Sequence, residues 1–115
     1  IWKEKSSTAN DLLSSRGKII LIDDKDQVLA YSQNSGNLDW FNKDFYLRNL
    51  TSPNKLKSLV IFGDYQGFIH ALDISKGEQV ARQRTSRSKI ISISIRDENV
   101  LTLDEKGKLS LFTLQ

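Results

Sequence analysis

The chain has 115 residues, of which 38% are hydrophobic and 27% are charged, and its formal net charge is +3. This length allows one domain with a modest core, and the composition is typical of a folded globular chain and excludes a disordered or collagen-like one. The chain contains no cysteine, which excludes disulfides and cysteine nucleophiles, and its mild charge is scattered among acidic residues, so we expect no nucleic-acid partner.

The predicted elements are short strands joined by turns, beginning with an isolated strand at residues 1–5. Three further groups follow in chain order, and no segment has the 3.6-residue apolar period of a helix. The first group has strands at 10–14, 18–22, 28–31 and 38–41. The second group has strands at 50–52, 58–62, 68–72 and 79–82, with Pro53 ending its first strand. The third group has strands at 90–95, 100–103 and 109–112 and lacks a fourth strand.

These groups are copies of one repeat. A shift of 41 residues places Ala30 on Ala71, and a further shift of 40 places Asp64 on Asp104. Four antiparallel strands in about 40 residues is the size of one propeller blade, which must stack on its neighbours to bury both faces. The sequence therefore predicts an all-β fold, a partial β-propeller of about two and a half to three blades of four-stranded antiparallel sheets.

The expected boundaries make the chain a fragment of a larger ring. Residues 1–5 are the outer strand of a preceding blade, 10–42 and 49–84 are two blades, and 89–115 is a last blade lacking its fourth strand. A fragment of this kind leaves sheet edges open, so we expect self-association through them.

The turn between the third and fourth strands of the first copy carries a motif. Residues 30–40 resemble the A-x-D-x-x-x-G-x-x-x-W motif of the propeller repeats found in pyrroloquinoline-quinone proteins. Residues 71–81 keep its Ala, Asp and Gly but have Ala81 in place of Trp. In that motif Trp packs on the next blade, so we expect inter-blade packing for Trp40 and also for Trp2, at the same position of a preceding blade.

Nearly the whole chain is similar to the C-terminal blades of the BamB family of outer-membrane assembly lipoproteins. The similarity includes residues 1–3, 24–30, 49–53, 59–70 and 77–83. It implies a location at the periplasmic face of the outer membrane, binding to POTRA domains of BamA and other assembly components, and anchoring through a lipid-modified cysteine that this chain lacks. The implied function is a protein-interaction scaffold without catalysis.

Two segments are candidate protein-binding sites. The connection 42–48 contains Phe45, Tyr46 and Arg48, and aromatic residues and arginine are enriched at binding hot spots. The alternative for Phe45 and Tyr46 is packing between blades. The second segment carries Arg82 and Arg84, which strand alternation places on one side; its alternative is an outer strand kept soluble by charge.

The sequence offers no catalytic, metal or cofactor site. His70 lies inside an apolar strand without a nucleophile motif, which favours a structural role. Asp23, Asp24 and Asp26 lack the spacing of a calcium loop and are typical of a solvated hairpin turn. Two other functions stay open: a fragment of a quinone-dependent dehydrogenase, which would need cofactor-binding residues, and a generic peptide-binding propeller.

Overall fold

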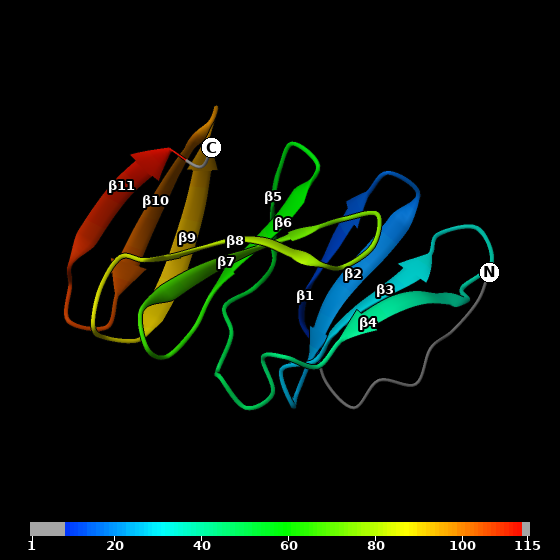
Figure 1. Ribbon diagram of the computed structural model, residues 1–115, viewed down its shortest axis with the longest axis horizontal. Helices are drawn as coiled ribbons and strands as arrows, with labels where there is room; N and C mark the ends of the chain where they lie inside the picture. Colours follow the sequence, from blue (N-terminus) through cyan, green and yellow to red (C-terminus); the bar gives the residue numbers. More distant parts are fainter. Residues whose placement is uncertain (1–8, 114–115) are drawn as a thin grey trace.

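The computed structural model describes residues 9–113, which form eleven β-strands and no helix. The strands make three antiparallel sheets that follow one another along the chain and fan out side by side (Figure 1). The described part thus contains no helix that is long and apolar enough to cross a membrane. The strand expected at residues 1–5, together with Trp2, lies outside the described residues.

The first sheet contains four strands in sequential order. They are β1 (Ala9–Ser15), β2 (Lys18–Asp23), β3 (Val28–Ser32) and β4 (Leu38–Asn42). The central strand β2 is almost entirely apolar because both of its faces pack. The turn before β4 has Gly36 at a φ of 77°, a conformation that residues with a Cβ rarely adopt.

The second sheet repeats this arrangement, with one difference from the sequence prediction. Its strands are β5 (Asn54–Leu56), β6 (Leu59–Gly63), β7 (Phe68–Asp73) and β8 (Gln79–Arg84). The strand expected at 50–52 is wrong, because the first strand begins after Pro53. The preceding backbone is already engaged: the N–H of Leu50 donates to the carboxylate of Asp26, and the N–H of Thr51 donates to the carbonyl of Gly63.

The third sheet has three strands within the described residues. They are β9 (Ile90–Arg96), β10 (Asn99–Asp104) and β11 (Leu109–Thr113), in the order β11-β10-β9. On its outer face Leu109 and Leu111 are 64% and 68% exposed. This face is therefore not covered by any other described part of the chain.

The core lies between the sheets and consists of two clusters. The first joins the facing sides of the first two sheets and includes Ile22, Trp40 and Phe62. The second joins the second and third sheets and includes Ile69, Ile90 and Val100. The first strands of the three sheets, β1, β5 and β9, lie next to one another, so each sheet stacks on its neighbour as propeller blades do.

Candidate functional site

One turn recurs in all three sheets and is built on an aspartate. Asp23 and Asp104 end strands β2 and β10, and Asp64 directly follows β6, at the positions that the repeat aligns. In each turn, Oδ1 accepts hydrogen bonds from the backbone N–H groups two and four residues later. The side chain thus replaces a backbone acceptor and closes the turn locally. These turns lie at the same end of the sheets as the long connections between them (Figure 1).

The second carboxylate oxygen ties two of these turns to other segments. Oδ2 of Asp104 accepts a hydrogen bond of 2.6 Å from the Ser86 hydroxyl, in the connection between the second and third sheets. Oδ2 of Asp64 lies 2.8 Å from Nε2 of His70 in β7. It also lies 3.6 Å from Nη1 of Arg48, which belongs to the connection between the first and second sheets. Each aspartate therefore fixes a connection relative to a turn.

These contacts shift the acidities of both carboxyls. Burial raises the pKa of Asp64, but the hydrogen bonds from the His70 ring and from the N–H groups of Phe68 and Gln66 together lower it below its ordinary value. The hydrogen bond from the Ser86 hydroxyl, followed by those from the turn N–H groups, holds the pKa of Asp104 below its ordinary value. Both side chains are thus built to stay ionised in the folded protein.

His70 and Asp64 form a buried pair that resembles part of a catalytic triad. Its geometry indicates a structural role instead. The second ring nitrogen, Nδ1, lies 2.8 Å from the side-chain amide of Gln79, which also donates to the carbonyl of Ala81. Because that amide nitrogen is a donor, Nδ1 accepts and the proton on Nε2 is donated to Asp64. Both ring nitrogens are therefore occupied, and the ring packs against Phe45 at 4.6 Å between centroids.

The candidate binding residues in the connection after β4 differ in their exposure to solvent. Phe45 is 3% exposed and packs edge-on against Phe62, with ring centroids 5.0 Å apart, so its place is the core between two sheets. Tyr46 and Leu47 are 51% and 60% exposed. Arg48 is partly covered and its carbonyl accepts from the N–H of Tyr65, another exposed aromatic residue. Tyr46, Leu47 and Tyr65 are thus exposed on two loops that are hydrogen-bonded to each other.

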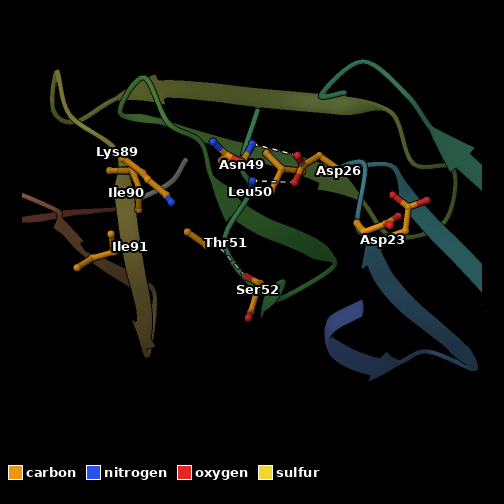
Figure 2. A pocket seen from close by; sticks show the side chains of 10 residues that line it. Asp23, Asp26, Asn49, Leu50, Thr51, Ser52, Lys89, Ile90 and Ile91 are labelled. Carbon is orange, nitrogen blue, oxygen red and sulfur yellow. Dashed lines mark hydrogen bonds between the residues drawn. The ribbon is translucent and has the colours of Figure 1, made fainter. Parts of the chain in front are cut away.

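The backbone of this connection is held in an unusual conformation. Leu47 has a φ of 57°, which is uncommon for a residue with a bulky side chain. Its N–H donates to the carbonyl of Lys25, and Asp26 accepts from the N–H groups of Asn49 and Leu50 (Figure 2). A residue with a bulky side chain in this conformation needs such support from its neighbours. The sequence prediction included Leu47 only as a member of the connection 42–48, because its backbone conformation and exposure become visible only in the structure.

A hollow of about 500 Å³ lies beside this connection. The turn at Asp23 and Asp26 forms one side, Lys89 and Ile91 form the other, and the segment from Asn49 to Ser52 runs between them (Figure 2). Both carboxylate oxygens of Asp26 are occupied by backbone donors. Within residues 9–113 the structure places no three His, Cys, Asp or Glu side chains where they could hold a metal ion.

Arg82 and Arg84 lie on the same face of the outer strand β8, as alternation predicts. Their guanidinium groups lie 5.1 and 5.0 Å from the centroid of the Phe68 ring. Nε of Arg84 also donates to the carbonyls of Gln66 and Ser86. The strand is almost entirely exposed, so both arginines are accessible from solvent.

Trp40 lies between the first two sheets. Its indole N–H donates to the carbonyl of Ile74 at 2.8 Å, and its ring packs on the turn at Gly77. The side-chain amide of Asn42 donates to the carbonyl of Gly77 next to it. The end of β4 is therefore joined to the turn between β7 and β8.

No protein-family model matches the chain. Its sequence is similar to the outer membrane protein assembly factor BamB of three bacteria. The protein of Shewanella oneidensis is 31% identical over 115 residues, which cover 99% of this chain and 29% of that protein. The protein of Yersinia pestis is 28% identical over 114 residues, 98% of this chain and 29% of that protein. That of Francisella tularensis is 32% identical over 108 residues, 93% of this chain and 23% of that protein.

Solved structures show the same fold. The crystal structure of BamB from Moraxella catarrhalis superposes with a TM-score of 0.82 at 20% identity, covering 90% of this chain and 30% of that one. The computationally designed protein Ika8 gives a TM-score of 0.78 at 15% identity, covering 92% of this chain and 33% of that one. The chain spans less than a third of the length of the three sequence relatives. By sequence and by fold, this chain is similar to part of the outer membrane protein assembly factor BamB.

Proposed function

We propose that this chain is part of a non-catalytic scaffold that binds other proteins during the assembly of outer-membrane proteins. The observation that carries the proposal is the similarity to BamB across 99% of the chain. Its partners would be the POTRA domains of BamA and other assembly components, at the periplasmic face of the outer membrane.

The surface that we assign to binding consists of Tyr46, Leu47 and Tyr65. These three exposed side chains come from two adjacent loops, and aromatic residues are enriched at binding hot spots. Their loops are held by Asp26 and Asp64, so little conformational entropy is lost when a partner docks. A rigid sheet stack that presents preformed loops is how propellers bind proteins without any chemical step.

Two features support a scaffold over the dehydrogenase alternative. The buried Asp64 and His70 side chains use their polar atoms on one another and on neighbouring groups of the fold. The carboxylates of Asp23 and Asp26 serve backbone N–H groups. These polar groups therefore act within the fold, and the accessible side chains at the loop end are of types suited to contacting another protein.

The test is binding of immobilised BamA POTRA domains by the chain, measured by biolayer interferometry. Leu47→Gly removes the exposed side chain and relieves the positive φ, so this variant should be at least as stable as the original chain and should bind several-fold more weakly. Arg16→Gly is the matched control, since Arg16 is exposed with a φ of 54° at the opposite end of the first sheet. Equal affinities of the original chain and both variants would reject this surface, and absence of any binding would reject the POTRA assignment.

A further inference from the structure

A second hollow lies at the rim of the third sheet, away from Tyr46 and Leu47. Its volume is about 530 Å³, and the connection from β8 to β9 and the turn between β10 and β11 form its walls. Four cationic side chains line it, namely Arg84, Arg87, Lys106 and Lys108. This volume lies in the range of clefts that bind small ligands.

The charges of this hollow are not balanced from within the fold. Among residues 9–113, none of the four cations takes part in an ion pair. The one lining carboxylate, Asp104, is buried and its oxygens accept from the Ser86 hydroxyl and from two N–H groups of its own turn. Asp104 interacts electrostatically with Lys108, and one carboxylate among four cations leaves a net positive site that attracts anions.

The walls are held in place by hydrogen bonds between the two segments. The N–H of Glu105 donates to the carbonyl of Lys89 at 2.9 Å, and the Ser110 hydroxyl donates to the carbonyl of Thr85 at 3.3 Å. Nε of Arg84 is fixed by the carbonyls of Gln66 and Ser86, so its remaining guanidinium nitrogens are oriented in advance. The site therefore does not have to be assembled when a ligand arrives.

We propose that this hollow binds an acidic segment of a partner protein through the carboxylates of that segment. The inference rests on the proposed scaffold function and adds a second contact region with a defined chemistry. A polypeptide is favoured over a membrane surface because the lining residues carry no large apolar side chain that would insert among lipids. Carboxylates complement the guanidinium of Arg84 and the ammonium groups, and several of them on one segment engage the four cations together.

The experiment uses the whole chain and a fluorescein-labelled hexaglutamate peptide, with a hexaglutamine peptide and phosphatidylglycerol vesicles as comparison ligands. Fluorescence anisotropy should show binding of hexaglutamate that weakens as salt is added. The double variant Arg87→Ala with Lys106→Ala should weaken this binding by up to about 25-fold, since exposed charge pairs contribute up to about fivefold each. Amide signals of residues 85–89 and 105–108 should shift in NMR spectra when hexaglutamate is added.

The control is the double variant Lys55→Ala with Arg96→Ala, which also removes one lysine and one arginine. Both residues are exposed, and each lies near the end of its sheet that is opposite to the hollow. Its affinity for hexaglutamate should stay within twofold of the original. Equal loss in both double variants would show a general charge effect and overturn the proposal, as would binding of vesicles without binding of the peptide. If POTRA domains bind but hexaglutamate does not, the hollow is rejected while the scaffold function stands.

Discussion

The indole N–H of Trp40 donates to the carbonyl oxygen of Ile74 at 2.8 Å and thereby ties the first sheet to the second. The ring lies so close to the turn at Gly77 that a Cβ on this residue would be 2.3 Å from the indole. Packing and hydrogen bonding therefore act at one place, and this place joins two units that the chain encodes 41 residues apart. Loss of either interaction should weaken the whole stack.

We expect Trp40→Ala to lower the free energy of unfolding by about 3 to 5 kcal/mol, because a large buried ring is lost and a cavity remains. Trp40→Phe should lower the free energy of unfolding less, because most of the buried ring is kept. The remaining cost, about 1 to 3 kcal/mol, arises because the carbonyl of Ile74 loses its hydrogen-bond donor. Urea denaturation followed by circular dichroism measures both values. Phe41→Ala, at the exposed neighbouring position, should change stability by about 0.5 kcal/mol or less. Similar losses for Trp40→Ala and Phe41→Ala would contradict the inter-sheet role.

Gly67 and Gly107 allow strain and steric contact to be separated. Both have a φ of 88° and stand at equivalent places in their turns. A Cβ added at Gly67 would be 2.0 Å from the carbonyl oxygen of Ser86, whereas a Cβ added at Gly107 would have no atom within 4 Å. Alanine at either position should cost about 1 to 2 kcal/mol for the backbone conformation. Gly67→Ala should cost about 1 to 3 kcal/mol more, because the backbone at Ser86 must move. Thermal unfolding of the two variants measures the difference, and equal midpoints would exclude a close approach at Ser86.

Asp26 occupies the place that glycine holds in the other two turns, with a φ of 64°, and its carboxylate accepts from the N–H groups of Asn49 and Leu50. Asp26→Gly keeps the backbone relaxed but removes both acceptors, at a cost of about 1.5 to 3 kcal/mol. Asp26→Ala loses the same acceptors and adds strain of about 1 kcal/mol. Amide hydrogen exchange at Asn49 and Leu50 should accelerate in both variants. Unchanged exchange would mean that Asp26 does not hold this connection.

The lowered pKa of Asp64 predicts a dependence of stability on acidity. The ordinary value is 3.8, and the folded-state pKa lies below it. The ionised form is thus favoured by folding. The contribution of Asp64 to the free energy of unfolding is therefore fully present at pH values above its ordinary pKa and is lost as the pH falls through the folded-state pKa. Asp64→Asn should lower stability at neutral pH and flatten the loss of stability below about pH 4. Urea midpoints measured from pH 7 to pH 2.5 test this, and a variant with the original slope would refute it.

Much of the fold was predictable from local patterns and the repeat. Runs such as Ile19 to Ile22 and the alternation from Ile90 to Ile95 predict strands because apolar spacing reports which faces are buried. The repeat of 40 to 41 residues predicted four strands per sheet, and the structure confirms an all-β stack of antiparallel sheets. The first strand of the second sheet was misplaced because Leu50 is buried without being in a strand. The N–H of Leu50 donates to the carboxylate of Asp26. This contact cannot be predicted from a local pattern, because the two residues are 24 positions apart in the sequence.

The candidate surfaces depended on tertiary structure. Phe45 and Tyr46 are adjacent aromatic residues in a connection without periodicity, so the sequence could not tell that one fills the core and the other faces solvent. Arg84 and Lys106 are distant in the chain and line one hollow only because two loops are hydrogen-bonded together. By itself the sequence determined the strands, their turns and their repetition, which are local properties of the chain. Which side chains meet was decided by the stacking of the sheets, because burial and charge balance depend on neighbours that only the folded chain supplies.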